Sequence, residues 1–564
     1  PPRPARRLKM AVRRLPSDFS LRGFRRRLAT LESVPQFAVL GVVSGIVTGL
    51  AILLFRTIIE IPLDLFLSGD FEDFESLSTA SAIMLPLAGS VVLAVMWALI
   101  GDKHQRVGVV HVLERLAGHQ GHMPWQNALT QFVGGIIALS TGHSGGREGP
   151  AIHLGAACSS LVGQQLSLPN NSIRVLAGCG AAAAISATFN TPVAGVIFSM
   201  EVIMMEYTMA GFIPVILAAV MAALINQTVY GDATAFSVPD VSMNSLFDVP
   251  FLILEGISIG ILAALFVRTI ETIHRRAPAR TWLRMLIAGT VTGLIAIAVP
   301  QVLGQGYDTV NQSLLGEFAF ITLITMCFFK LIASAITVAL GVPVGVIGPT
   351  LFIGATAGGA LGYIGALLFP DLASSPALYV MLGMGAMMGA ALQAPLAALM
   401  AVMELTQNPN IVLPAMLVIV IANITASQAF GLKSLFATQM ALLGLDFRQN
   451  PRSMALNRAS VASVMSRSFD RVPQVVDRQR AQEICKEQSV WLLVDVKGVP
   501  AFILRARDLA THLENQADDS DVDLKEIPAV RRDVASVLLQ ATLAEVMDSL
   551  DSRDVDAVYV NRIS

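Results

Sequence analysis

Two short segments of this sequence combine glycine and proline in a pattern that suits the binding of an anion. The first is Gly145-Gly146-Arg147-Glu148-Gly149-Pro150, and the second is Val344-Gly345-Val346-Ile347-Gly348-Pro349. Proline is accepted just inside a helix start, because its missing N–H would have no intrahelical partner there. Each segment therefore predicts a helix N-terminus whose free N–H groups and positive dipole end attract negative charge.

Glu148 places an ionisable carboxylate beside the first helix start, in an apolar region of the chain. A carboxylate at membrane depth is costly and is a functional candidate by default. When ionised it competes with a permeant anion for the helix start, and when protonated it loses that attraction and can move away. We expect Glu148 to be a gate. We expect Arg147 to be structural, donating to backbone carbonyls or a second carboxylate; a structural Arg147–Glu148 ion pair is the alternative.

The expected anion ligands are backbone N–H groups from both segments. They are those of Gly146, Arg147, Glu148 and Gly149 in the first segment, and of Val346 and Ile347 in the second. Free donors at a helix start need no particular side chain, so valine and isoleucine are compatible with this role. A simpler alternative is that the glycines only permit close helix packing. The repetition of the pattern favours an anion site.

Composition indicates that these segments lie in a membrane protein. Of 564 residues, 54% are hydrophobic and only 14% are charged, and the mean hydropathy is +0.64. These values are typical of a chain that crosses a bilayer several times. Several apolar stretches are too short or too rich in glycine for a simple span, which predicts broken, re-entrant helices surrounded by protein.

The similarity between the two segments continues downstream, where Gly178-Cys179-Gly180 and the run from Pro192 to Glu201 resemble Gly383-Met384-Gly385 and the run from Pro395 to Glu404. The chain is therefore predicted to contain two homologous membrane repeats. Paired Gly/Pro-interrupted apolar segments indicate a substrate site at the interface between such repeats.

The remaining boundaries follow from charge. Arginine and lysine dominate residues 1–33, which predicts a cytoplasmic N-terminal segment rather than an arm that binds nucleic acid. The repeats then cover residues 34–240 and 241–446. From residue 447 the chain becomes charged, with short strand-like runs, so residues 447–564 are predicted to form a soluble cytoplasmic domain.

Together these motifs resemble the CLC family of chloride channels and anion/proton exchangers, and the tail resembles a CBS pair whose second module is incomplete. The resemblance implies an all-α polytopic membrane domain of two inverted-topology repeats with broken re-entrant helices, plus a small α/β CBS-pair domain. It implies a homodimer in the lipid bilayer of a plasma membrane, the bacterial inner membrane, with both termini cytoplasmic. It implies chloride or another small monovalent anion as the permeant ion, Glu148 as the gating glutamate, and neither enzymatic activity nor a required cofactor.

Three positions depart from the family pattern. Val107 stands where relatives carry a serine that touches the central anion, and Phe436 stands where they carry a tyrosine. Each missing hydroxyl weakens anion stabilisation by on the order of 1 kcal/mol, which predicts a weak central site lined by Val107 and Phe436. Val202 replaces the second glutamate of proton-coupled relatives. This loss of the proton-relay position favours a passive chloride channel or uniporter.

Other interpretations stay open. A chloride/proton antiporter with a non-standard inner proton route is the main alternative, a membrane-anchored sensor is another, and bicarbonate or nitrate could replace chloride. In the tail, Gly498 and Asp508 match part of the adenine-nucleotide turn of CBS modules, whereas Arg505 occupies its hydroxyl position. The residues Gly142 to Gly146 satisfy G-x-S-x-G, but a hydrolase would need a strand before the serine. Histidine and cysteine spacing predicts no metal site.

Overall fold

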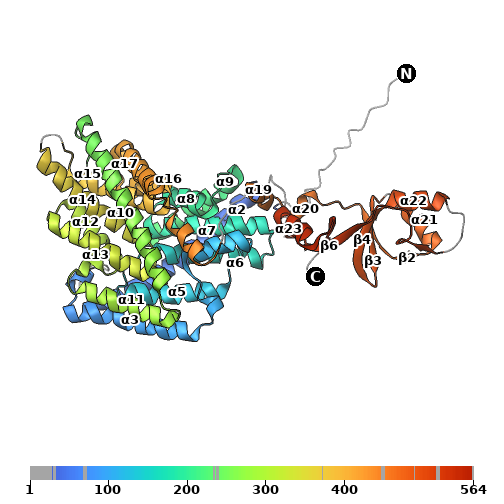
Figure 1. The fold of residues 1–564 in the computed structure, drawn as a ribbon, viewed down its shortest axis with the longest axis horizontal. Coiled ribbons are helices and arrows are strands. Elements are labelled where there is room, and N and C mark those ends of the chain that lie inside the picture. The colour runs from blue at the N-terminus through green and yellow to red at the C-terminus, as the bar shows by residue number, and fades with distance from the viewer. Residues whose placement is uncertain are drawn as a thin grey trace, which may run out of the picture. The chain divides into compact units, whose positions relative to one another are not determined.

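The computed structural model describes residues 28, 34–67, 73–232, 236, 241–370, 373–445, 451–487, 489–515 and 521–561. The chain divides into a helical unit, Phe37–Asn450, and a smaller unit that contains Pro451–Ser564. Figure 1 labels the helices and strands of both units.

Long apolar helices make up the first half of the helical unit. They are α2 (Val34–Phe66), α3 (Thr79–Leu99), α4 (Gly108–Gly118), α5 (Trp125–Ser140), α6 (Glu148–Gln165), α7 (Asn170–Phe189), α8 (Pro192–Phe198) and α9 (Met209–Tyr230). A single π-helical segment, η3 (Ser199–Met204), continues α8. Short 3₁₀ turns, η1 (Phe74–Ser76) and η2 (Asp102–His104), flank α3.

The second half follows the same order. Its helices are α10 (Val249–Arg276), α11 (Thr281–Ala296), α12 (Tyr307–Leu315), α13 (Phe320–Ala339), α14 (Ile347–Leu368), α15 (Pro376–Leu392), α16 (Pro395–Thr406), α17 (Val412–Ile424) and α18 (Leu435–Leu442). Shorter elements are the 3₁₀ turns η4 (Leu246–Asp248), η5 (Pro300–Val302) and η6 (Pro409–Ile411), and the π-helical η7 (Thr425–Ala429).

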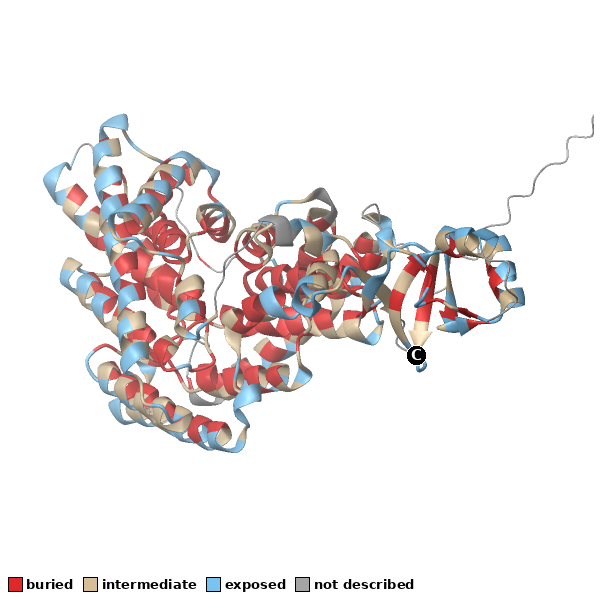
Figure 2. Cartoon of the chain, turned by 45° about the vertical axis from the view of Figure 1, so that its right-hand side comes forward, coloured by how far each residue is buried: buried red, intermediate tan, exposed pale blue. Residues whose placement is uncertain are grey.

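Eight helices in the described residues are long and apolar enough to cross a membrane. Others are too short to do so, among them Pro376–Leu392, Pro395–Thr406 and Pro192–Met204. The prediction of a polytopic, mostly helical unit with broken helices is therefore confirmed. Figure 2 shows that buried residues concentrate inside this unit, as is needed where short helices leave backbone groups at membrane depth.

The two halves use the same glycine contact to bring neighbouring helices together. A Cβ on Gly155 of α6 would lie 2.3 Å from the carbonyl oxygen of Gly180 on α7, and a Cβ on Gly354 of α14 would lie 2.2 Å from that of Gly383 on α15. Neither position can carry a side chain. The contact makes Gly180 equivalent to Gly383, so the sequence-based pairing of Gly178 with Gly383 was wrong by two residues.

Glu201 and Glu404 link the two halves reciprocally. The carboxylate of Glu404, on α16, accepts hydrogen bonds from the N–H groups of Val193 and Ala194 at the start of α8, at 3.0 and 2.7 Å. The carboxylate of Glu201 accepts from Leu396 and Ala397 at the start of α16, at 3.4 and 2.7 Å. Each glutamate thus caps the short helix of the other half, which is a structural role.

The smaller unit is a sheet with helices. Its strands are β1 (Phe469–Pro473), β2 (Val475–Val476), β3 (Trp491–Val496), β4 (Val499–Arg505), β5 (Val522–Asp523), β6 (Arg532–Leu538) and β7 (Ala557–Asn561). Its helices are α19 (Pro451–Arg458), α20 (Val461–Val464), α21 (Arg478–Lys486), α22 (Ala506–Asn515) and α23 (Leu543–Arg553). The larger sheet has the order β1-β3-β4-β6-β7, and β2 pairs with β5.

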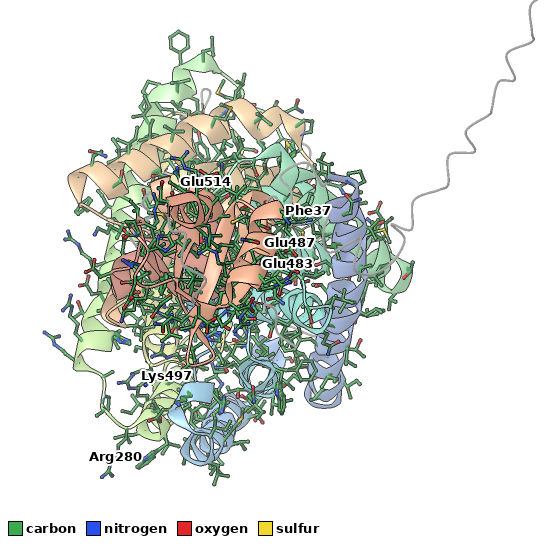
Figure 3. The ribbon with its side chains drawn as sticks, turned by 90° about the vertical axis from the view of Figure 1, so that its right-hand side faces the viewer. Phe37, Arg280, Glu483, Glu487, Lys497 and Glu514 are labelled. Atoms are coloured by element: carbon green, nitrogen blue, oxygen red, sulfur yellow. The ribbon has the colours of Figure 1, made fainter. Side chains whose placement is uncertain are left out.

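Charged residues cover the outside of this unit. Figure 3 labels Glu483 and Glu487 on and just after α21, and Arg480 of the same helix forms ion pairs with both at 3.0 and 3.5 Å. Apolar residues of β3 and β4 are buried beneath the helices, including Leu492, Val494 and Leu504. The tail is therefore a small sheet-and-helix fold with its own buried core.

Candidate anion site

The two glycine-proline segments meet directly. The N–H of Gly146 donates to the carbonyl of Gly345 at 2.9 Å, and the N–H of Gly345 donates to the carbonyl of Gly146 at 2.6 Å. These bonds form an isolated antiparallel bridge between residues far apart in the chain. The bridge brings together the starts of α6 and α14, which the sequence predicted to be helix N-termini. It also occupies the N–H of Gly146, so in this conformation that group is not available to an anion, contrary to expectation.

The carboxylate of Glu148 lies between these two helix starts. A Cβ on Gly146 would lie 1.8 Å from Glu148 Oε2, one on Gly345 would lie 2.8 Å from the same atom, and one on Gly348 would lie 3.2 Å from Oε1. Three glycines therefore make the space that the carboxylate fills. Glu148 is fully buried. The ionised carboxylate of Glu148 thus places negative charge where two helix N-termini converge. The sequence predicted this location for a permeant anion.

A tyrosine that the sequence did not predict holds this carboxylate. The hydroxyl of Tyr307, the first residue of α12, donates to Glu148 Oε1 at 2.5 Å. The second oxygen, Oε2, is buried and has no hydrogen-bond partner among the described residues. A buried oxygen without a donor is unfavourable, which leaves the carboxylate held on one side only.

Arg147 plays the structural role that was expected. Its guanidinium donates to the carbonyl of Thr188 at the end of α7, at 3.2 Å, and lies 6.0 Å from the centre of the Tyr307 ring. No ion pair joins Arg147 to Glu148 in the described part of the chain. The alternative of a structural Arg147–Glu148 pair is therefore wrong, although the guanidinium still adds positive potential near the carboxylate.

Fixed side chains occupy the neighbouring helix starts. Gln131 of α5 accepts a hydrogen bond from the N–H of Gly108 at the start of α4, at 2.7 Å, and donates to the carbonyl of Pro343 at 3.1 Å. The starts of α8 and α16 are capped by the two glutamates described above. By contrast, no side-chain cap from the flanking residue closes α6 or α14. Glu148 is the ionisable group beside these two starts.

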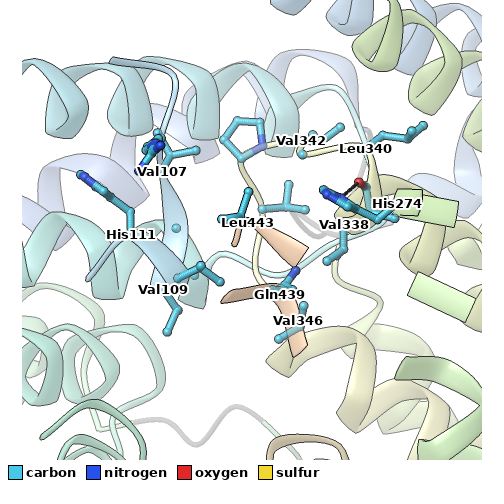
Figure 4. A pocket seen from close by; sticks show the side chains of 18 of the residues that line it. Val107, Val109, His111, His274, Val338, Leu340, Val342, Val346, Gln439 and Leu443 are labelled. Atoms are coloured by element: carbon cyan, nitrogen blue, oxygen red, sulfur yellow. Dashed lines mark hydrogen bonds between the residues drawn. The ribbon is translucent and has the colours of Figure 1, made fainter. Parts of the chain in front are cut away.

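A cavity of about 310 Å³ adjoins this site. Gly149, Val346, Ile347, Val107 and Phe436 all line it, so the structure brings together most of the predicted anion-binding residues. Gly345 lines the cavity too and also lies against Glu148 Oε2, so the carboxylate stands at its end. Figure 4 labels aliphatic side chains around the cavity: Val107, Val109, Val338, Leu340, Val342, Val346 and Leu443.

The cavity wall near the helix starts carries no serine or tyrosine hydroxyl at positions 107 and 436. Val107 is the residue before α4, and Phe436 lies in the first turn of α18. Val202 is buried in the π-helical η3 and offers no ionisable group. The predicted weak central site and missing proton relay both remain predictions, with these residues now located in space.

A second group of polar residues supports the loop before α12. Lys330, fully buried in α13, donates to the carbonyls of Val302 and Gly304 at 3.1 and 2.9 Å. The Gly304 carbonyl also accepts from the N–H of Gly145 at 3.3 Å. This loop is thus tied to the segment that leads into Glu148.

Acidic residues surround the same end of α12. Carboxylate oxygens of Asp73, Glu75 and Asp308 lie within 4.8 Å of one another. Thr309 donates to Glu75 Oε1 at 3.0 Å. Burial and the neighbouring Asp308 raise the pKa of Glu75 to about 7, although the hydrogen bond from Thr309 opposes the shift.

The other candidate sites do not assemble. Ser144 shares a hydrogen bond with Ser334 at 2.9 Å, whereas the adjacent His143 bonds to Ser90, so among the described residues Ser144 has no histidine base. In the tail, Asp508 lies on α22 and is not among the residues that line the cavity between β1, β3, β7 and α23. The Arg505 guanidinium stacks over Trp491. A nucleotide contact at Asp508 is unsupported.

Some residues at the site left little signal in the sequence. Tyr307 belongs to no repeated motif. Lys330, and Glu255 on α10 away from the site, were visible as single charges inside apolar stretches, which is the usual mark of a functional or strongly supported residue. Both oxygens of Glu255 are buried and lack a partner in the described structure.

Sequence comparison places this arrangement among known proteins. Residues 89–427 match the family described as "Voltage gated chloride channel". A ClcB-like protein of Ralstonia nicotianae is 32% identical over 368 residues, which cover 64% of this chain and 85% of that protein. The H(+)/Cl(−) exchange transporter ClcA of Vibrio parahaemolyticus is 28% identical over 300 residues, 51% of this chain and 64% of the transporter.

Solved structures share the fold. A slow cyanobacterial Cl−/H+ antiporter superimposes with a TM-score of 0.64 and 24% identity, covering 72% of this chain and 98% of its own. A CLC-type fluoride/proton antiporter gives 0.62 and 21% over 73% of this chain and 99% of its own. A eukaryotic CLC transporter gives 0.57 and 18% over 93% of this chain and 95% of its own, which extends into the smaller unit.

Proposed function

Because this chain belongs to the voltage-gated chloride channel (CLC) family of anion channels and transporters, we propose that it conducts chloride passively and that protonation of Glu148 opens its path. It is a multi-pass membrane protein. We place it as a homodimer in a bacterial inner membrane, in line with its bacterial relatives, with both termini cytoplasmic.

The position of Glu148 carries this proposal. Its buried carboxylate fills a space made by Gly146, Gly345 and Gly348, at two helix starts whose flanking residues give no side-chain cap. An ionised carboxylate there excludes a second anion by occupying the same positive end of two helix dipoles. Protonation removes its charge, and the free N–H groups of Val346, Ile347 and Gly149 can then face chloride.

Passive flux is favoured over exchange by Val202, which offers no inner proton relay. The runner-up is a chloride/proton antiporter with a non-standard inner proton route, and the relatives that are exchange transporters and antiporters favour it. Val107 and Phe436 give the cavity wall no hydroxyl donor at these two positions, so it binds anions more weakly there, which speeds their exit from a pore with several sites.

Ion flux from liposomes separates these functions. Purified protein in chloride-loaded vesicles, with valinomycin clamping the voltage, is followed by chloride and pH electrodes together. Chloride efflux without stoichiometric proton movement is expected for the channel; proton uptake locked to efflux would establish the antiporter. Repeating the assay with bicarbonate and nitrate identifies the preferred anion.

The gate has its own test. Wild-type flux should rise as pH falls, since protonation neutralises Glu148. Glu148→Gln mimics the protonated carboxyl and should give high flux with most of the pH dependence removed. A pH dependence equal to that of the wild type in this variant would contradict the gating role.

A further inference from the structure

A hydrogen bond joins Tyr307 to Glu148. Tyr307 is nearly buried, and its hydroxyl donates to one oxygen of the carboxylate. The other oxygen has no partner among the described residues. One side-chain hydrogen bond therefore distinguishes the observed position of Glu148 from a position away from the helix starts. Hydrogen bonds to an ionised group are the strong ones, so the contact favours the charged carboxylate over the protonated one.

The Tyr307 ring is fixed by its neighbours. Its centre lies 5.5 Å from that of Phe236, edge to face, and 6.1 Å from that of Phe189. Gly306, just before it, has φ +77°, a left-handed conformation that favours glycine. Rings packed in this way restrict the two side-chain torsions of a tyrosine, so its hydroxyl is held in one direction.

The backbone that carries Tyr307 is fixed to the gate segment as well. Lys330 donates to the carbonyl of Gly304, and the same oxygen accepts the N–H of Gly145. The N–H of Gly304 donates in turn to the carbonyl of Gly142 at 3.1 Å. The loops before α6 and before α12 are therefore held together by reciprocal backbone hydrogen bonds.

From this geometry we propose that Tyr307 is a positioning residue for the gate, whose hydroxyl holds the ionised carboxylate of Glu148 at the helix starts and so sets the pH at which the path opens. The inference rests on the proposed gating function of Glu148. It assigns the closed state to a hydrogen bond across the two repeats rather than to the helix starts alone.

Several charged groups face this contact and enter its pH dependence. Arg147, the residue just before α6, adds positive potential near the carboxylate. Lys330 of α13 lies behind the loop before α12. The acidic cluster, defined as Asp73, Glu75 and Asp308, lies at the first turn of α12 and attracts protons to the same end of that helix. Because Glu75 titrates near pH 7, the test must separate its contribution from that of Glu148.

The experiment compares chloride efflux against pH for the wild type, Tyr307→Phe, Glu148→Gln and the double variant. Phenylalanine keeps the packed ring and removes only the donor. The flux-against-pH curve of Tyr307→Phe should move to higher pH by about one unit, a tenfold change in the ratio of open to closed gate. In the Glu148→Gln background the same substitution should change nothing. Glu75→Gln, measured in parallel, identifies any part of the curve that belongs to the acidic cluster.

Tyr379→Phe is the matched control, because the hydroxyl of Tyr379 also donates to a buried carboxylate, that of Asp248, at 2.7 Å. It should lower thermal stability and leave the flux curve in place. Incorporation of 3-fluorotyrosine at position 307 gives a second, nearly isosteric variant with a stronger donor, and the curve should then move to lower pH.

The outcomes are distinct. If the curves of Tyr307→Phe and the fluorotyrosine variant both coincide with that of the wild type while Glu148→Gln abolishes pH dependence, the positioning role is wrong and the gate stands. A Tyr307→Phe shift that persists in the Glu148→Gln background would also overturn it. If Glu148→Gln keeps the wild-type pH dependence, the proposed function itself fails.

Discussion

At the scale of single residues, the site depends on glycines, which have no side chain, and on two positions without a hydroxyl group. Three glycines leave room for the Glu148 carboxylate, and Val107 and Phe436 present only carbon to the adjoining cavity. At these positions an anion meets backbone N–H groups, whereas polar side chains such as Arg106, Arg284 and Gln439 line other parts of the cavity. Such a site binds through helix dipoles and free amides, with little help from side chains.

Restoring two hydroxyls should strengthen this site. The double substitution Val107→Ser and Phe436→Tyr adds donors on opposite segments of the cavity wall, and chloride binding should tighten roughly tenfold or more, since each net hydrogen bond contributes about 1 kcal/mol. Isothermal titration calorimetry in detergent measures the change. Val109→Ser places a hydroxyl elsewhere on the same wall and serves as control; equal affinities for the double variant and the wild type would mean that these positions do not face the anion.

At the scale of helices, the helix starts differ in whether a side chain from another helix accepts a hydrogen bond from their N–H groups. The starts of α4, α8 and α16 receive acceptors from Gln131, Glu404 and Glu201. Those of α6 and α14 receive none from their flanking residues. Unpaired N–H groups at a buried helix start are costly, so these two starts need an occupant, either Glu148 or an anion.

Removal of the fixed caps should affect stability rather than gating. Glu404→Ala and Glu201→Ala each expose two N–H groups at the start of a short helix, at a cost of about 1 to 2 kcal/mol. Thermal unfolding in detergent should show similar losses for the two variants, and Glu404→Gln, which keeps one acceptor, should lose less. A loss from one variant alone would mean that the two caps are not equivalent.

Much of this arrangement was predictable because it rests on local rules. Glycine followed by proline marks a helix start wherever it occurs, and a repeated pattern implies a shared geometry, so α6, α14 and their meeting point followed from the sequence. The structural role of Arg147 was also expected. A carboxylate among apolar residues identified Glu148 as a candidate.

The contacts that were missed join distant parts of the chain without a repeated pattern. Tyr307 lies 159 residues from Glu148 in sequence, and nothing local marks its hydroxyl as a donor to that carboxylate. The Gly146–Gly345 bridge uses N–H groups that a local rule counts as free. The shifted equivalence of Gly180 and Gly383 shows that glycine-rich helices align ambiguously until packing selects one register.

At the scale of the whole molecule, the balance of protons contributes to stability. Burial raises the pKa of Glu75 to about 7 from an ordinary value of 4.5. The folded protein therefore binds more protons than the unfolded chain between these pH values. The stabilisation is fully present below pH 4.5 and is lost as pH rises through about 7.

This linkage predicts a difference between wild type and Glu75→Gln. Thermal unfolding from pH 4.5 to 8 should show the wild type losing about 1 to 2 kcal/mol relative to the variant as pH rises, a modest value because solvent screens a partly exposed carboxyl. The glutamine keeps an acceptor for Thr309 and does not titrate. Parallel pH profiles for the two proteins would rule out Glu75 as the source.

The reciprocal caps of Glu201 and Glu404 also have a consequence for the synthesis and membrane insertion of the chain. The N–H of Val193 finds its acceptor in Glu404, 211 residues further along. Until the second half of the helical unit is synthesised, the start of α8 lacks this carboxylate acceptor. The first half is therefore incomplete on its own, so a chain cut between the two halves should be degraded in the cell rather than accumulate.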